Sequence, residues 1–451
     1  MREHPVRAVL RRLLAALIGL YFRRITVVGP APERRTAGRL LAANHVNALV
    51  DPILVLTQTR AVISPVAKST LWKLPGLRWL LDVAAAVPIV RRVDAPDKAA
   101  GTNDRVFARV GAHLAGGGNI LIFPEGTSHN QPHLAPLRTG AGRMLARARA
   151  DGGRGLAVQA VALAFDARDT FRSRALVLFA PPRALDELVP PDADADAVAA
   201  AVTEAVRADL ASLLVEAPSW ALHLGIARVA ELYAHSHVAE GDDAARSLPG
   251  QHALGLRVGA AQRVLAAAAP AEVEALLAEV ARYDDALAAV GLDDEVVALG
   301  VVSRRAGAWL RALAMVVTAP LALVGLALYY LPYVLPRAIT RRLGPTTDAV
   351  STYKLGVALV VYPLWFTVGV VLALLLVPWP WSALAVAALV VTPWAVLPWL
   401  DRQARLGVVW RALRPGAARA ALPRLVAHRA ALMARLEEVR RRVEGEADPR
   451  T

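Results

Sequence analysis

The sequence predicts an α/β domain, a mixed sheet flanked by helices, followed by a helical region and then a membrane-embedded helical region. Three observations support this prediction. From residue 25 to about 180, short apolar or β-branched runs alternate with helical stretches, which is typical of a sheet with helices packed on it. From about 183 to 300 the chain is rich in alanine and lacks strand signals. Between 312 and 400 lie three apolar runs, each near the roughly 20 residues that a bilayer crossing needs.

Composition supports a membrane portion and limits the kinds of partner. The chain has 451 residues, of which 56% are hydrophobic, and a formal charge of +14 that comes mostly from arginine. Such a charge suits nucleic acid, anionic lipid or a phosphorylated substrate. Seven of the ten tryptophans lie between Trp309 and Trp410, beside the apolar runs, and this placement favours a bilayer over nucleic acid. The lack of cysteine excludes disulfides and cysteine nucleophiles and agrees with a cytosolic active domain.

The N-terminal segment predicts a helix that lies on a membrane surface. Apolar residues at helical spacing occupy Val6 to Arg24, and arginines flank them. The uninterrupted apolar core is about half as long as a crossing requires, so an amphipathic, membrane-associated helix is expected over residues 1–24. A signal peptide is the alternative interpretation, but Arg23 and Arg24 stand where small cleavage-site residues would be needed.

Within the α/β domain, seven strands are expected from the apolar runs. Helices are expected at 104–114 and 138–150, because each of these stretches is followed by glycine. The strands are predicted at 25–29, 39–45, 61–67, 86–90, 119–126, 156–165 and 175–180.

The region after the sheet contains two features that need an interpretation. The Asp-Ala-Asp-Ala-Asp run at 192–196 is expected to be a solvated turn. His235 and His237 form a pair that suggests a metal, but no second group of ligands accompanies them, so a surface helix is preferred.

The apolar runs at 312–335, 355–377 and 382–400 raise a question of topology. Only Pro-Trp-Pro-Trp joins the second run to the third, so these two are expected to form a hairpin with aromatic anchors at its turn. Basic residues before and after the hairpin place both of its ends in the cytoplasm. If the first run also crossed, the α/β domain would lie on the side of the membrane away from the cytoplasm. The arginines before that run instead favour a cytoplasmic position for it. Its prolines and Gly325 therefore favour a re-entrant or interfacial segment.

These signals predict a multi-pass protein of the cytoplasmic membrane with its α/β domain on the cytoplasmic side. The basic stretch 422–443 is either a membrane-surface helix or a partner helix, and the sequence leaves both open. The predicted regions are an amphipathic helix (1–24), the α/β domain (25–185), a helical extension (186–305), transmembrane or re-entrant helices (306–401) and a basic cytoplasmic tail (402–451).

Two polar segments follow apolar strands, where a catalytic α/β domain places its reactive groups. The first contains His45 and Asp51. Histidine accepts a proton from an alcohol near neutral pH, and a carboxylate on its other ring nitrogen fixes the tautomer and stabilises the imidazolium. Because Asp51 precedes Pro52, it is expected to cap a helix that starts there, which leaves a loop that can fold His45 back onto Asp51. An ordinary strand-to-helix loop is the alternative.

Further residues suit an anion. Arg91 and Arg92 end a strand and can bind phosphate. The second polar segment, 123–128, contains Gly126, which permits close backbone approach, and the hydroxyls of Thr127 and Ser128. Arg138 would add positive charge near a helix start. Surface solvation and a plain turn are the alternatives.

In this order and spacing, the segments resemble the blocks of the phospholipid/glycerol acyltransferase superfamily, over roughly residues 20–185. The most specific piece is Phe-Pro-Glu-Gly-Thr-Ser at 123–128. The resemblance implies a catalytic dyad of His45 and Asp51, an acceptor-phosphate arginine at Arg91 and a substrate-binding pair at Glu125 and Gly126. The expected substrate-binding set is Asn47, Arg91, Glu125, Gly126, Thr127 and Arg138.

Two positions depart from the common family pattern. Five residues separate His45 from Asp51, where four are usual, and this spacing resembles a branch that includes yeast-type glycerol-3-phosphate acyltransferases. In the fourth block, Ala160 stands where the family usually has proline.

The reaction implied is direct transfer of a fatty acyl group from acyl-CoA or acyl-acyl-carrier-protein to glycerol 3-phosphate or 1-acylglycerol 3-phosphate. No acyl-enzyme is expected, because the chain has no cysteine and no serine in a nucleophile-elbow pattern. No metal or other cofactor is expected either. The alternatives are remodelling of lysophospholipids and an inactive lipid-binding scaffold, against which the intact set of reactive residues argues. Membrane lipids are expected partners, and nucleic acid is not.

Overall fold

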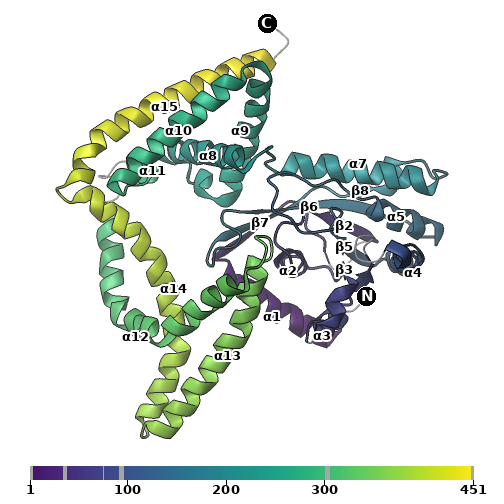
Figure 1. Cartoon of the computed structure of the whole chain (residues 1–451), viewed down its shortest axis with the longest axis horizontal. Helices are drawn as coiled ribbons and strands as arrows, with labels where there is room; N and C mark the ends of the chain where they lie inside the picture. Colours follow the sequence, from purple (N-terminus) through teal and green to yellow (C-terminus); the bar gives the residue numbers. More distant parts are fainter. Residues whose placement is uncertain (1–3, 34–37, 75, 91–95, 300–304, 448–451) are drawn as a thin grey trace. The chain divides into compact units, whose positions relative to one another are not determined.

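The computed structural model describes residues 4–33, 38–74, 76–90, 96–299 and 305–447 (Figure 1). The chain divides into two compact units. We call them the sheet unit, Met1–Trp220 with Thr346–Thr352, and the helical unit, Ala221–Pro345 with Tyr353–Thr451.

The sheet unit is built on a mixed sheet whose strands follow the order β1-β7-β6-β2-β5-β3-β4, with β8 paired to β6. Neighbouring strands are parallel, except that β6 runs antiparallel to β7 and β8. All seven predicted strands are present, and the two-residue β8 was not predicted. The strands are β1 (Arg24–Val28), β2 (Arg39–Ala43), β3 (Ile63–Lys68), β4 (Val87–Ile89), β5 (Asn119–Ile122), β6 (Ala157–Phe165), β7 (Arg174–Phe179) and β8 (Arg183–Ala184).

Helices pack on both faces of the sheet. Successive residues of a strand point to opposite faces, so alternate side chains of the central strands belong to two separate apolar cores. Leu40 and Ala42 of β2 belong to the apolar core that includes residues of α4, α5 and α7. Leu41 and Ala43 belong to the core that contains Val55 of α2, and α1 packs against α2. The helices are α1 (Pro5–Tyr21), α2 (Val50–Thr57), α3 (Leu77–Val83), α4 (Pro96–Ala115), α5 (Gly140–Ala150), α6 (Leu185–Leu188) and α7 (Ala195–Leu213), with a 3-10 turn η1 at Ser69–Lys73.

The first helix of the predicted extension belongs to the sheet unit. Helix α7 packs on α5 and β6. The Asp-Ala-Asp-Ala-Asp run leads into it, and Asp194 accepts a hydrogen bond from the Ala197 amide at 2.7 Å. Asp194 is therefore the N-terminal cap of α7, and the last two residues of the run lie in its first turn.

The helical unit has an apolar core of its own. Helix α15 contributes Leu425, Leu432, Leu436 and Val439 to it, so the apolar side of the basic stretch 422–443 packs on other helices of this chain. The helices are α8 (Trp220–Ala239), α9 (Leu248–Ala268), α10 (Pro270–Val290), α11 (Asp294–Leu299) and α15 (Ala417–Ala447), with a 3-10 turn η2 at Asp243–Arg246.

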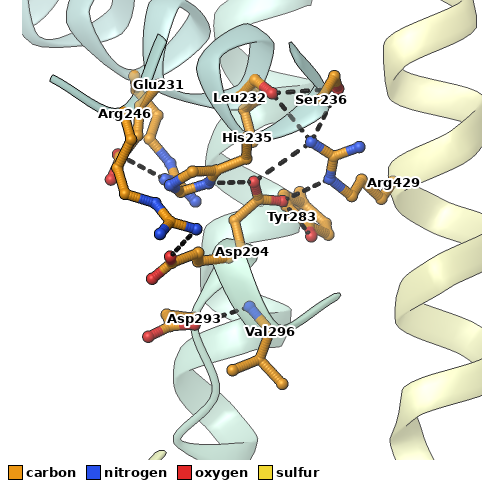
Figure 2. Close-up of polar contacts among 12 residues, drawn as sticks. Glu231, Leu232, His235, Ser236, Arg246, Tyr283, Asp293, Asp294, Val296 and Arg429 are labelled. Atoms are coloured by element: carbon orange, nitrogen blue, oxygen red, sulfur yellow. Dashed lines mark hydrogen bonds and ion pairs between the residues drawn. The ribbon is translucent and has the colours of Figure 1, made fainter. Parts of the chain in front are cut away.

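A buried polar cluster contains one side chain from each of four helices, α8, α10, α11 and α15 (Figure 2). The Asp294 carboxylate lies 2.7 Å from Nδ1 of His235, and its other oxygen accepts bonds from the Tyr283 hydroxyl at 2.7 Å and from Nε of Arg429 at 2.8 Å. Burial would raise the pKa of Asp294, but hydrogen bonds from His235, Arg429 and Tyr283 and the charge of Arg429 lower it below its ordinary value. The prediction that His235 lies on a surface helix is wrong, because the side chain is needed in this cluster and is buried.

Three described helices are long and apolar enough to cross a membrane: Ala312–Leu343, Val350–Leu376 and Trp381–Leu400. They lie in α12 (Arg305–Leu343), α13 (Val350–Leu376) and α14 (Trp381–Leu413), and only a short turn separates α13 from α14, as the hairpin prediction requires. Figure 1 shows that α12 bends, and the helix contains three prolines, which cause kinks. One continuous helix runs from Arg305 to Leu343, and a re-entrant or interfacial position for this segment stays a prediction.

Candidate active site

The predicted reactive residues follow neighbouring parallel strands. His45 comes just after β2 and Glu125 just after β5, and these strands pair in parallel. Strand β6 also runs parallel to β2, and Arg168 follows it. The carboxyl ends of the three strands therefore share one edge of the sheet, which is where open α/β sheets bind ligands.

His45 and Asp51 form the predicted pair. Nδ1 of His45 lies 3.0 Å from Oδ2 of Asp51. The Asp51 side chain is fully buried, whereas that of His45 is 17% exposed. With its carboxylate on Nδ1, the imidazole carries its proton there, and Nε2 is left to accept one from a substrate. The predicted contact between the two side chains is present, and their role as a catalytic dyad stays a prediction.

The start of α2 differs from the prediction. The helix begins at Val50, Leu49 takes the cap position, and Asp51 lies in the first turn. The Asp51 carboxylate does not cap the helix. Instead Oδ2 accepts bonds from the backbone amides of Val46 and Asn47, at 2.8 and 2.7 Å, so one buried oxygen holds both the imidazole and the loop that carries it.

Glu125 supports the same loop from the other side. One oxygen of its buried carboxylate accepts the His45 amide at 2.7 Å. The other accepts the Ala135 amide at 2.8 Å and contacts Nε2 of His129. The His45 ring also stacks on Phe123, with ring centroids 4.1 Å apart. Glu125 thus positions the backbone of His45, and its predicted contact with substrate stays a prediction.

Gly126 and Arg138 lie together, as their proposed shared anion site requires. Gly126 has a positive φ of 78°, and a Cβ on it would lie 2.6 Å from Nε of Arg138. The Arg138 amide donates to the carbonyl of Pro124 at 2.8 Å. Thr127 and Arg138 are both exposed beside a glycine where only a small residue fits, and the Thr127 hydroxyl donates to the Ser128 carbonyl at 3.3 Å.

Of the remaining predicted residues, Asn47 lies within the described part of the chain and Arg91 does not. Asn47 is buried, and its Nδ2 donates to the Arg168 carbonyl at 3.2 Å; a contact with substrate stays a prediction. Arg91, the expected acceptor-phosphate arginine, lies outside the described residues, as does Arg92.

Three residues of the site were missed by the sequence-based prediction. His129 bonds Glu125, four residues before it, and this spacing was a signal that could have been used. Asn44, at the end of β2, bonds to the backbone of β6. Its Oδ1 accepts the Leu163 amide at 2.7 Å, and its Nδ2 donates to the Leu163 carbonyl at 3.2 Å. Arg168 donates from Nη1 to the Val46 carbonyl at 3.0 Å. Burial lowers the pKa of Arg168, against the opposing effect of three nearby carboxylates.

Comparison with known proteins bears on this site directly. Residues 24–164 match the family model described as Acyltransferase, and that stretch contains the His45–Asp51 pair and the Glu125 segment. The matched stretch is an acyltransferase domain, and this finding supports the resemblance to the phospholipid/glycerol acyltransferase superfamily. We call the matched stretch the acyltransferase domain.

Two curated relatives align with parts of the chain. It is 33% identical over 165 residues to a lyso-ornithine lipid O-acyltransferase of Pseudomonas aeruginosa, which covers 37% of this chain and 55% of the relative. It is 38% identical over 85 residues to glycerol-3-phosphate O-acyltransferase 2 of Saccharomyces cerevisiae, covering 19% of this chain and 11% of the relative. The chain thus spans about half the length of the first relative and about a tenth of the second.

Among solved structures, the chain is similar to the 1-acyl-sn-glycerophosphate acyltransferase PlsC of Thermotoga maritima. The TM-score is 0.34 and the identity 19%, with 46% of this chain and 78% of that chain covered.

Proposed function

We propose that this chain is a membrane-bound O-acyltransferase that transfers a fatty acyl group from a thioester donor to a hydroxyl of glycerol 3-phosphate or 1-acylglycerol 3-phosphate, in phospholipid biosynthesis. The observation that carries the proposal is the 3.0 Å contact between Nδ1 of His45 and the buried Asp51 carboxylate. It lies in a domain of a family of acyltransferases.

In the proposed reaction, Nε2 of His45 removes the proton of the acceptor hydroxyl as that oxygen attacks the thioester carbonyl carbon. The tetrahedral intermediate then collapses, the carbon–sulfur bond breaks, and the imidazolium returns its proton to the departing thiolate. Asp51 stabilises the imidazolium between the two steps. The products are an ester and a free thiol.

The donor in this proposal is acyl-CoA or acyl-acyl-carrier-protein, and no further cofactor takes part. Arg138, Thr127 and the backbone at Gly126 would bind a phosphate of donor or acceptor, because they combine positive charge with exposed donors. Membrane lipids remain the third proposed partner.

The proposed location is the cytoplasmic membrane, with the acyltransferase domain on its cytoplasmic side. Packing inside the helical unit restricts the topology. Helix α10 precedes the three apolar helices and α15 follows them, yet the two pack together and Arg435 pairs with Glu279 at 2.6 Å. Both lie on one side of a bilayer, so the number of crossings between them is even. This packing supports a topology in which fewer than three of the apolar helices cross completely.

The stretch between α12 and α13 supports one assignment of the crossings. Residues 346–352 belong to the sheet unit, although residues 221–345, which include α12, separate them in sequence from its other residues. Both ends of α12 therefore lie on the same side. We infer that α13 and α14 cross as a hairpin and that the bent α12 enters from one face without crossing.

A second candidate acceptor is another lysolipid. The relative from Pseudomonas aeruginosa, identical at 33% over 165 residues, is a lyso-ornithine lipid O-acyltransferase. This similarity favours a lysolipid over glycerol 3-phosphate, whereas the yeast relative favours glycerol 3-phosphate.

One assay separates these choices. The purified full chain in mixed micelles is given labelled acyl-CoA or acyl-acyl-carrier-protein with each of glycerol 3-phosphate, 1-acylglycerol 3-phosphate, a lysophospholipid and a lyso-ornithine lipid. We expect labelled ester with a phosphate-bearing acceptor. Ester with the lyso-ornithine lipid alone would establish the second candidate, and thiol release without ester for every acceptor would contradict acyl transfer.

A further inference from the structure

A short segment far along the chain contacts the loops that form the acyltransferase site. Residues Thr346–Thr352 comprise part of the connection after α12 and the first three residues of α13, and they belong to the sheet unit. They lie outside the acyltransferase match at 24–164, and nothing in the sequence linked them to the chemistry.

The first contact is to the helix that carries Asp51. The hydroxyl oxygen of Thr352 accepts the Leu49 amide at 3.1 Å. Leu49 caps α2, and amides at a helix start have no acceptor within the helix. Thr352 supplies the acceptor for the amide of Leu49, which lies two residues before Asp51 in the sequence.

The second contact reaches the loop through Arg168. The buried Ser351 donates its hydroxyl to the Arg168 carbonyl at 2.7 Å. The same carbonyl accepts Nδ2 of Asn47, and the Arg168 guanidinium donates to the carbonyl of Val46. Ser351 thereby holds Arg168 in place, and Arg168 in turn holds the loop between His45 and Asp51.

The third contact is to the segment at 123–128. Asp348 accepts a hydrogen bond from the Ser128 hydroxyl. Burial would raise the pKa of Asp348, but bonds from the Ser128 and Thr346 hydroxyls and the charge of Arg168 lower it. The group is a carboxylate at neutral pH, and it takes the hydroxyl that was expected to donate to phosphate.

We propose that Thr346–Thr352 is a positioning segment of the active site, which holds the His45–Asp51 loop in its reactive geometry. Three side chains from one seven-residue stretch bond to the start of α2, to the Arg168 carbonyl and to Ser128. Because Nδ1 of His45 must meet a carboxylate in the first turn of α2, a shift of that turn moves Asp51 away from the imidazole. The end of the connection after α12 and the first turn of α13 thus position the catalytic pair.

The test compares Thr352→Val, which keeps the β-branched shape but loses the acceptor, with Thr352→Ser, which keeps it. Thr347→Val at a neighbouring exposed position is the matched control. In the full chain, Thr352→Val should raise hydrogen exchange of the Leu49 and Val50 amides by about tenfold, while the serine variant and the control exchange as wild type does.

The kinetic readout rests on the proposed function, and the exchange readout does not. We expect kcat of Thr352→Val to fall between about tenfold and about a hundredfold with KM and the melting temperature little changed, and Thr352→Ser to restore most of it. Unchanged exchange in the valine variant would overturn the proposal, as would an equal loss in the serine variant. Altered exchange in a chain with no acyltransferase activity would support the positioning segment and contradict the proposed function.

Discussion

Glu125 shows how a residue of the site can act through the backbone. Its carboxylate accepts two amides, those of His45 and Ala135, and contacts the His129 ring. Each carboxylate oxygen accepts at least one hydrogen bond. The NH₂ group of a glutamine at this position would therefore face another donor and find no acceptor.

We expect Glu125→Gln to lower both stability and kcat, because the new NH₂ group must face a donor. A buried donor left without an acceptor costs about 1–3 kcal/mol in the free energy of unfolding. Thermal unfolding and the kinetic constants would be measured together, with Thr127→Val at the exposed neighbour as the control for stability. A raised KM with unchanged unfolding would instead identify Glu125 as a substrate ligand.

Local spacing was enough to predict the His45–Asp51 contact but not what surrounds it. Asp51 and Pro52 suggested a cap, yet the carbonyl of Asn47 already accepts the Val50 amide at 2.9 Å, so the helix starts earlier. The partners of Glu125 and the role of Arg168 depend on which strands lie side by side. Ser351 lies 183 residues from Arg168 along the chain, and no local pattern reports such a contact.

At the scale of elements, strands were predicted well because buried parallel strands are continuous apolar runs. The apolar helices were predicted for the same reason, but composition does not show how they pack. Helix α12 packs against α14, where a Cβ on Gly325 would lie 2.5 Å from Cγ2 of Val396 and 2.7 Å from Cβ of Thr392. The two helices approach closely because this residue is glycine.

Gly325→Ala should therefore weaken the packing of α12 on α14. Overpacking of this kind costs about 1–3 kcal/mol. Gly356→Ala in α13 is the matched control, since nothing lies within 4 Å of a Cβ at that glycine among the residues that the structure describes. Thermal unfolding of both variants in the same detergent checks the prediction, and equal melting temperatures for the two would refute it.

The Asp294 cluster gives the helical unit a dependence on pH. The pKa of Asp294 is lower in the folded protein than in the unfolded chain, so its stabilising effect is complete above the unfolded value, near 4, and is lost as the pH falls through the folded value. Asp294→Asn should destabilise the protein by about 3 kcal/mol at pH 7, because Arg429 then lacks its buried partner. Melts of both proteins at several pH values would show this difference shrinking below pH 4. A difference that stays constant down to pH 3 would contradict the assignment.

For the whole molecule, the topology can be tested because the chain has no cysteine. Single cysteines at Thr347, at Trp379 in the hairpin turn and at His133 in the sheet unit would be labelled with an impermeant maleimide in sealed vesicles. We expect Thr347→Cys and His133→Cys to react from the same side and Trp379→Cys from the opposite one. Labelling of Thr347→Cys from the side opposite to His133→Cys would show that α12 crosses.

The central claim is that His45 is the general base of acyl transfer, and one comparison tests it most directly. Purified wild type and His45→Ala are given the same labelled thioester and the acceptor that wild type uses, and ester formation is followed under identical conditions. We predict a fall of about 10³-fold or more in kcat with an unchanged melting temperature, because the His45 imidazole is the only side-chain base in hydrogen-bond contact with Asp51 within the described part of the chain. Ester formation by the alanine variant at the wild-type rate would contradict the account.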